Sequence, residues 1–305
     1  MYAFRKIILV NLIAAIIILF PSYSYPCACG CNVFSVGGRW MMVISPGFRF
    51  FWTYNYMNQN QNWNGWNSAE SGLNQDKIIR SEFYNLNALY TLDRSWGLMV
   101  EAPVWNRYFQ TTTDDGNPVS ASHLSLADLR LMGIYTGISE DMSIGIQFGL
   151  KLPTAPYNLS LLDRDTQIGT GTTDLLLGGY SMRQQRGWGW FTQVMLQHAF
   201  NYKDGYRPGD SFDFAVGAHY DKLLSSYKIV PMLQLNASFR RSDSGVNSDP
   251  SSTGYTRIYV SPGVEINLSN QIQLYGNFKI PVLTHVTGFQ LVAPALVDVT
   301  LGYQL

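Results

Sequence analysis

Segments in which apolar and polar residues alternate recur along almost the whole chain. In 211–223 (SFDFAVGAHYDKL), Phe212 and Val216 belong to the apolar set, and Asp213 and His219 belong to the polar one. Successive side chains of a β-strand point to opposite faces, so such a segment has one apolar and one polar face. Twelve segments follow this pattern, and most are 11–15 residues long. They span 39–57, 78–92, 97–109, 124–136, 142–152, 171–183, 188–200, 211–223, 227–240, 256–268, 272–281 and 291–305.

The length of these segments favours a membrane barrel over a soluble β-protein. Strands of soluble proteins are usually about 5–6 residues long, whereas a tilted strand that crosses a membrane needs about 9–11. The sequence therefore predicts an all-β fold, an up-and-down antiparallel transmembrane β-barrel of about 12 strands.

The connections between the segments support the same fold and give it an orientation. Short turns near 93–96, 139–141, 184–186, 224–226 and 269–271 alternate with longer polar loops near 58–77, 110–123, 153–170, 201–210, 241–255 and 282–290. Barrels of the bacterial outer membrane have short periplasmic turns and long outer loops, whereas a soluble Greek-key sandwich has no reason to show this alternation. We therefore expect the protein in the outer membrane of a Gram-negative bacterium, with both termini in the periplasm.

The N-terminus has the pattern of an export signal. Arg5 and Lys6 precede an apolar run over 7–20, and the small residues Ser22 and Ser24 follow it. This run is shorter than the roughly 20 residues that a membrane-spanning helix needs, and it is typical of a cleaved signal peptide. The predicted organisation is a signal peptide over 1–24, a Cys-rich periplasmic segment over 25–38 and the outer-membrane barrel over 39–305.

Composition limits the partners. The chain has 21 basic and 21 acidic residues, so its net charge of zero gives no electrostatic support for a nucleic-acid partner. It also has 19 Tyr and 8 Trp, which suit aromatic girdles at the two surfaces of a membrane. Tyr90, Trp96, Trp188, Tyr227 and Tyr303 all fall near the ends with short turns. The end of the last strand, 297–305, resembles the terminal strand that the barrel-assembly machinery recognises. The expected partners are therefore outer-membrane lipid, that machinery and a small-molecule solute.

Charged strand residues should face the lumen, because an Arg or Lys on the lipid face near the midplane costs about 2–4 kcal/mol. The charged members of this set comprise six basic and seven acidic residues, a balance that gives no selectivity for ions of one sign and suggests a narrow passage. The candidate lumen-lining residues are Arg49, Glu101, Arg107, Asp128, Arg130, Lys151, Asp174, Gln193, Gln197, Asp213, His219, Asp221, Gln234, Arg257, Glu265, Lys279 and Asp298.

Two short stretches resemble a known family. Residues 169–180 read GTGTTDLLLGGY, and residues 89–97 read LYTLDRSWG, with EAPV following at 101–104. They are similar to motifs of the phenol-degradation MetA-pathway family of outer-membrane β-barrel transporters. The resemblance implies a barrel that passes aromatic or other small hydrophobic compounds. It also implies that Asp174 faces the lumen below the Gly-rich loop.

The cysteines form one cluster, CACGC, at Cys27, Cys29 and Cys31. A lipid anchor, a disulfide and a site for a soft ion such as Cu(I) or Zn(II) are alternative interpretations. Residues 25–38 could also reach into the lumen as a small stopper. No other cofactor is expected.

The sequence favours a channel for passive diffusion of small, uncharged or aromatic and hydrophobic solutes. The alternatives are a sealed structural or surface-binding barrel and a metal-linked protein that uses the CACGC segment. An outer-membrane hydrolase is the least favoured reading, because it would need a Ser–His pair. His123 is flanked by Ser122 and Ser125, but neighbours in sequence are not a catalytic geometry, so we expect no enzyme activity.

Overall fold

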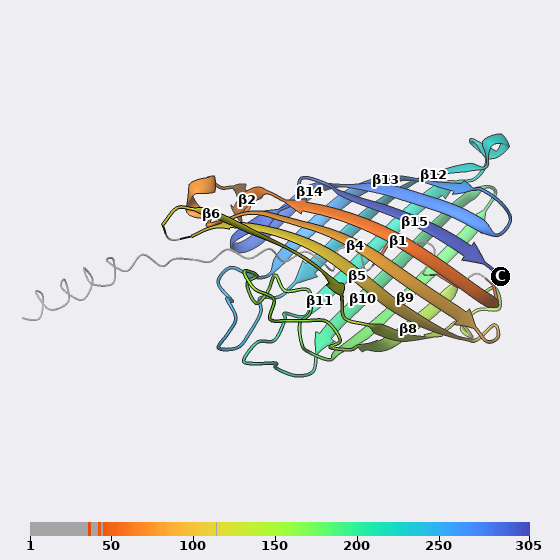
Figure 1. Ribbon diagram of the computed structural model, residues 1–305. Helices are drawn as coiled ribbons and strands as arrows, with labels where there is room; N and C mark the ends of the chain where they lie inside the picture. The colour runs from red at the N-terminus through yellow and green to blue at the C-terminus, as the bar shows by residue number, and fades with distance from the viewer. Residues whose placement is uncertain (1–35, 38–41, 44, 114) are drawn as a thin grey trace, which may run out of the picture.

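A computed structural model describes residues 36–37, 42–43, 45–113 and 115–305 of the chain (Figure 1). Twelve of its strands form one closed antiparallel barrel, because each strand pairs with the next around the barrel and β1 pairs with β15. The predicted all-β barrel of 12 strands is therefore confirmed. The barrel strands are β1 (Gly47–Gln59), β4 (Asp76–Thr91), β5 (Trp96–Thr112), β7 (Arg130–Tyr135), β8 (Ile144–Lys151), β9 (Asp174–Gln185), β10 (Trp188–Ala199), β11 (Ser211–Tyr220), β12 (Ile229–Arg240), β13 (Tyr255–Asn267), β14 (Ile272–Val292) and β15 (Leu296–Gln304).

Shorter elements lie in the connections. β2 (Gln61–Gly65) and β3 (Asn67–Ser68) extend the sheet beyond β14, and β6 (Pro118–Leu126) pairs with the outer half of β5. Two single 3-10 turns, η3 (Ser71–Leu73) and η4 (Ser225–Tyr227), complete the list. Among the residues that the structure describes, no helix is long and apolar enough to cross a membrane.

The two ends of the barrel differ as the sequence predicts. The short turns and the C-terminus lie together at the right-hand end of Figure 1, and most of the long loops lie at the left-hand end. We refer to these as the turn end and the loop end. Two predicted loops are wrong. Residues 110–123 are mostly strand, because β5 continues to Thr112 and β6 begins at Pro118. Residues 282–290 belong to β14, which continues to Val292. Its outer part pairs first with β13 and then with β2, past a β-bulge, so a polar sequence is held in a strand that extends beyond its neighbours.

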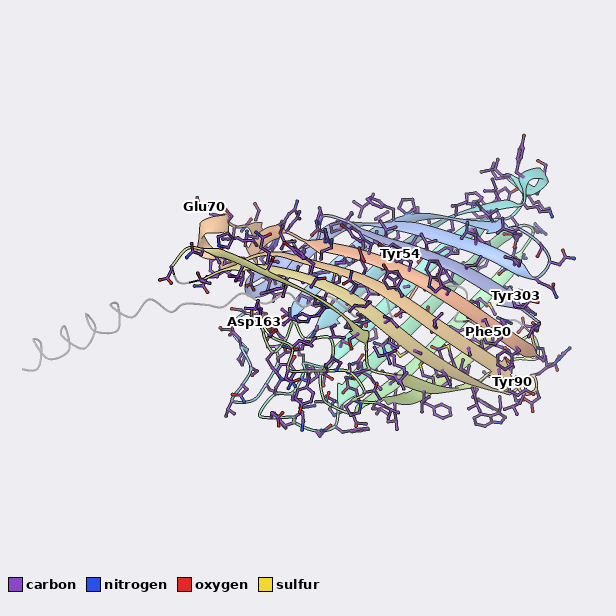
Figure 2. All side chains as sticks on the ribbon, viewed as in Figure 1. Phe50, Tyr54, Glu70, Tyr90, Asp163 and Tyr303 are labelled. Carbon is purple, nitrogen blue, oxygen red and sulfur yellow. The ribbon has the colours of Figure 1, made fainter. Side chains whose placement is uncertain are left out.

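The barrel is apolar outside and polar inside. Large apolar side chains are exposed on its outer face, including Leu86, Leu98, Val100, Leu131, Ile146, Phe148, Leu177, Leu196, Phe212, Val216, Leu233, Leu235, Phe278, Ile280 and Leu301. A contiguous apolar surface of this size marks a face that contacts lipid rather than water. Phe50, Tyr90 and Tyr303 project outward at the turn end (Figure 2), where aromatic rings suit the membrane surface.

The predicted strand 124–136 is two strands. β6 and β7 are separated at residues 127–129, and β5 changes partner between them: Glu101 is opposite Arg130 of β7, whereas Val104 is opposite Leu126 of β6. Pro103 stands at this change, and its carbonyl accepts a hydrogen bond from the Ala127 amide at 2.8 Å. The nitrogen of Pro103 has no hydrogen to donate, and it faces the same gap between β6 and β7. The proline therefore costs no hydrogen bond between neighbouring strands.

The first strand begins later than the predicted residue 39. β1 starts at Gly47, and the described residues Met42 and Val43 lie outside any strand. Gly47 has a φ of 122°, which a residue with a side chain rarely adopts, and this conformation lets the chain turn at the edge of the barrel. The predicted signal peptide lies outside the described residues, as do the three cysteines.

Candidate functional site

The lumen contains most of the charged residues that the sequence assigns to it. Fourteen of the seventeen candidates are buried, and the other three, Arg130, Gln197 and Asp221, are partly exposed. Asp128 lies between β6 and β7, and Asp221 follows β11 at the turn end with 40 % of its side chain exposed, so neither belongs to a strand.

Opposite charges are paired across neighbouring strands. Lys279 Nζ lies 3.1 Å from Asp298 Oδ2, and Asn55 donates to the other oxygen of that carboxylate at 2.9 Å. Arg130 and Glu101 lie opposite each other with 3.9 Å between their nearest charged atoms. Because these four charges form two pairs of opposite sign, they present little net field to a passing ion.

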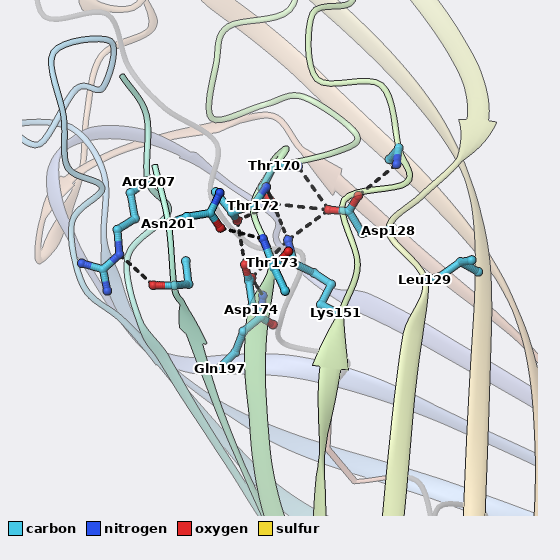
Figure 3. Close-up of polar contacts among 12 residues, drawn as sticks. Asp128, Leu129, Lys151, Thr170, Thr172, Thr173, Asp174, Gln197, Asn201 and Arg207 are labelled. Carbon is cyan, nitrogen blue, oxygen red and sulfur yellow. Dashed lines mark hydrogen bonds and ion pairs between the residues drawn. The ribbon is translucent and has the colours of Figure 1, made fainter. Parts of the chain in front are cut away.

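An outer charged network connects polar groups of the wall with the loop after β8 (Figure 3). It comprises Lys151, Asp128, Asp174, Thr170 and Thr172. Lys151 Nζ lies 3.0 Å from Asp128 Oδ2 and 3.1 Å from Asp174 Oδ2, and it also donates to Thr170. Thr172 donates to Asp174 at 2.6 Å. The network joins β8 and β9 to the loop between them, which explains why an Asp starts β9 directly after a Gly-rich loop.

That loop, residues 152–173, folds against the inner wall at the loop end. Arg107 donates to the carbonyl oxygens of Thr166 and Gln167. Leu162 packs in a buried cluster with Ile79, Phe109 and Leu291. Sequence reasoning treated the segment as a polar outer loop. The signal it missed is the set of large apolar residues inside the loop, which would be costly to leave in water.

Below the network, toward the turn end, the lumen also contains a group of buried apolar side chains. We call this group the lumen apolar cluster. Its side chains come from the inward positions of seven strands, from the turn after β7 and from the N-terminal segment. The cluster comprises Val36, Met42, Val43, Phe51, Leu89, Met99, Met132, Ile134, Met142, Leu176, Tyr180, Phe191, Met195 and Ala215, with Met182 packed against it. Sequence reasoning missed this cluster because it considered only polar inward residues. The apolar residues of the cluster occupy the same alternate strand positions as those polar residues.

The described residues before β1 lie inside the barrel. The Val43 amide donates to the Tyr180 hydroxyl at 3.1 Å, and Arg49 Nη1 donates to the Met42 carbonyl at 3.1 Å. The Gly37 amide donates to Gln193 Oε1 at 2.9 Å. These bonds attach the segment to β1, β9 and β10, so it occupies lumen volume at the turn end.

A cavity of about 790 Å³ opens at the turn end beside this segment, and its lining includes Met42, Met182, Trp190 and His219. His219 Nε2 lies 3.1 Å from Gln184 Oε1 and 3.4 Å from Asp221 Oδ1. A smaller cavity of about 70 Å³ lies at the loop end and is lined partly by Trp105.

The histidine considered for hydrolysis is not placed beside its neighbouring serines. His123 Nε2 lies 3.0 Å from the Ser160 carbonyl oxygen. Ser122 donates to Asn106, and Ser125 donates to the Leu126 carbonyl. Within the described part of the chain, no group of three or more His, Cys, Asp or Glu side chains could hold a metal ion.

Comparison with known proteins shows likeness in fold only. No protein-family model matches the chain, and no curated protein does, so the family resemblance rests on the two short stretches. The crystal structure of an outer-membrane channel from Pseudomonas putida F1 superposes with a TM-score of 0.66 at 11% identity, over 88% of this chain and 99% of that one.

More distant structures include the β domain of the Bordetella autotransporter BrkA, with a TM-score of 0.47 and 12% identity over 86% of this chain and 100% of that one. The toluene transporter TodX of P. putida has a TM-score of 0.43 and 9% identity over 85% and 90% of the two chains. The first likeness shows a barrel of the bacterial outer-membrane type.

Proposed function

We propose that the protein is an outer-membrane channel through which small, uncharged, apolar or aromatic solutes diffuse passively. The observation that carries this proposal is the lumen apolar cluster, which gives an apolar solute a favourable environment inside the wall. The paired charges above it give neither anions nor cations an advantage.

The surroundings of the protein follow from the same proposal. Outer-membrane lipid covers the apolar outer face, the barrel-assembly machinery inserts the chain, and both termini face the periplasm. The likeness in fold to an outer-membrane channel supports this proposal, as do the turns gathered at one end with the C-terminus.

Uptake by intact cells tests the solute class. A Gram-negative host that expresses the protein should take up radiolabelled toluene faster than the same host with an empty vector, whereas uptake of the charged benzoate should not change. Replacing Leu176, which is buried in the lumen, with Asn should reduce toluene uptake several-fold, because a polar amide would then interrupt the apolar path.

Leu177 provides the matched control. It is the next residue of β9, it faces the lipid with 42% of its surface exposed, and Leu177→Asn should leave uptake unchanged. Equal uptake by Leu176→Asn and the unaltered protein, at equal amounts in the outer membrane, would contradict the proposal.

A sealed barrel is the second candidate, and a specific observation favours it. The N-terminal residues occupy the lumen at the turn end, and the 152–173 loop packs inside the loop end. Single-channel recording in a planar bilayer separates the two functions, since a sealed barrel would show no conductance steps and no solute uptake.

A further inference from the structure

Three apolar side chains from neighbouring strands lie side by side on the outer face near the loop end. On β10, β11 and β12, Leu196 is opposite Phe212, and Phe212 is opposite Phe239. All three side chains are exposed, and the rings of the two phenylalanines stack with their centroids 6.0 Å apart. We call these three residues the apolar row. The row continues the lipid-facing surface of the barrel toward the ends of these strands.

The next outward positions of the same three strands are polar. Two residues farther toward the loops, the chain carries His198, Asp210 and Arg241. The Arg241 amide donates to the Asp210 carbonyl at 2.9 Å, so the chain still pairs at this level, just beyond the ends of β11 and β12. Because side chains two residues apart share one face of a strand, these three residues lie beyond the apolar row on the same outer face.

Asp210 has three basic side chains around it. Asp210 Oδ1 lies 2.9 Å from His198 Nδ1 and 3.4 Å from Arg207 Nη2, and Asp210 Oδ2 lies 3.9 Å from Arg241 Nη1. Arg207 Nε donates to the Ala199 carbonyl at 2.9 Å, which holds this guanidinium against the end of β10. We call His198, Arg207, Asp210 and Arg241 the basic patch. Arg241 exposes 84% of its side chain, so an anion can approach the patch from outside the barrel.

The basic patch has an excess of positive charge. Two guanidinium groups face one carboxylate, and His198 adds a further positive charge when it is protonated. The neighbouring charges of the same loops are paired with each other: Arg240 Nη2 lies 2.7 Å from Asp243 Oδ1, and Lys203 Nζ lies 3.7 Å from Asp204 Oδ1. The excess charge of the patch therefore remains available to an anion.

Strand β10 gives the depth of the basic patch in the membrane. Trp188 is exposed at the turn end and packs against Tyr220 of β11, with 4.6 Å between the ring centroids. His198 follows Trp188 by ten residues. Ten residues of a strand rise about 33 Å, and at the tilt of a barrel strand they cover about 25 Å, the height of the apolar band of a membrane barrel. The patch thus lies at the level of the lipid headgroups of the leaflet at the loop end.

We propose that the basic patch binds a phosphate group of a phosphorylated glycolipid, the lipopolysaccharide of the outer leaflet, whose acyl chains lie along the apolar row. A guanidinium group donates two parallel hydrogen bonds to phosphate oxygens, and basic pockets at a membrane surface recognise lipid headgroups. The inference rests on the orientation proposed above, in which the loop end faces outward. It does not depend on which solute passes through the lumen.

The test measures binding of fluorescent lipid A, the phosphorylated anchor of lipopolysaccharide, to the full mature chain refolded in detergent. Fluorescence anisotropy follows the titration. Lipid A with both phosphates should bind about tenfold more tightly than lipid A from which the phosphates have been removed. Millimolar inorganic phosphate should not displace it, because free phosphate has no acyl chains for the apolar row, whereas a site for the free ion would release the lipid.

Substitutions in the basic patch should change the affinity in opposite directions. Arg207→Gln and Arg241→Gln should each weaken binding several-fold, because each removes a positive charge. Asp210→Asn should tighten binding several-fold, because it removes the negative charge that competes with the phosphate and keeps a side-chain oxygen for His198. A purely structural role of Asp210 would give the opposite sign or no change.

Arg186→Gln is the matched control and should leave binding unchanged. Arg186 is exposed in the turn between β9 and β10, at the other end of β10 from the patch. The shift of the folded barrel on unheated gels would verify that every variant is folded. The proposal is overturned if removing the phosphates does not weaken binding, if inorganic phosphate displaces lipid A, or if Arg186→Gln weakens binding as much as Arg241→Gln. Toluene uptake does not enter this measurement, so either proposal can fail without the other.

Discussion

Lys151 is held inside the barrel by two carboxylates. Its ammonium group lies about equally far from Asp128 and Asp174, and all three side chains are almost completely buried. Removing one member of a buried charged group leaves its partners uncompensated in a medium of low dielectric constant, and this typically costs about 3–5 kcal/mol. The same residues replaced together by neutral ones of similar shape need not destabilise the fold.

We therefore expect Lys151→Met to lower the free energy of unfolding by about 3–5 kcal/mol. Urea-induced unfolding of the barrel in lipid vesicles, followed by tryptophan fluorescence, measures the change. Lys222→Met, at an exposed position in a turn, is the control and should have little effect. Adding Asp128→Asn and Asp174→Asn to Lys151→Met should recover most of the loss; a triple variant as unstable as the single one would contradict this explanation.

At the scale of the element, β11 shows how the environment changes along one strand and across its two faces. Asp213 and Ala215 are buried in the lumen, whereas Phe212 and Val216 face outward. Val216 stands near the middle of the strand, opposite Thr192 of β10 and Leu235 of β12. Tyr227 follows in the next turn, in η4, where 71% of its surface is exposed.

Arginine substitutions should therefore depend on depth. Val216→Arg places a charge against the hydrocarbon and should cost about 2–4 kcal/mol, whereas Tyr227→Arg at the membrane surface should cost about 0–1 kcal/mol. The unfolding experiment in vesicles measures both. Equal effects of the two substitutions would show that hydrocarbon does not cover the outer face of β11.

At the scale of the whole molecule, the described residues of the N-terminal segment lie inside the barrel and are hydrogen-bonded to its wall. Val36 and Met42 belong to the lumen apolar cluster. The Gly37 amide donates to Gln193 of β10, and Tyr275 of β14 donates to the Gly37 carbonyl at 3.4 Å. The segment thus contributes contacts that no single strand could supply. It also fills volume that would otherwise be open to ions.

A mature chain that begins at Gly47 should consequently conduct ions several-fold better than the intact protein in a planar bilayer. A chain that lacks only 25–35 is the control, because it keeps the described residues inside the lumen, and its conductance should match the intact protein. Equal conductance of the two deletions would show that residues 36–46 do not restrict the passage.

Much of the fold follows from local patterns of residues, so the sequence alone determined it. The period-two alternation, the length of each segment and the order of short and long connections are properties of contiguous residues, and they predict twelve strands in one closed barrel. Parity also assigns residues such as Arg257 and Lys279 to one face, and the structure buries both. The 282–290 segment shows the limit of this reasoning, since its polar residues belong to a strand whose partners lie elsewhere in the chain.

The tertiary structure decided what closure of the barrel brings together. The partner change of β5 at Pro103, the fold of the 152–173 loop against Phe109 and the position of Met42 in the lumen all depend on residues far apart in sequence. A lumen is enclosed only when the last strand pairs with the first. The contacts inside it join residues of different segments, so no single segment of the sequence predicts them.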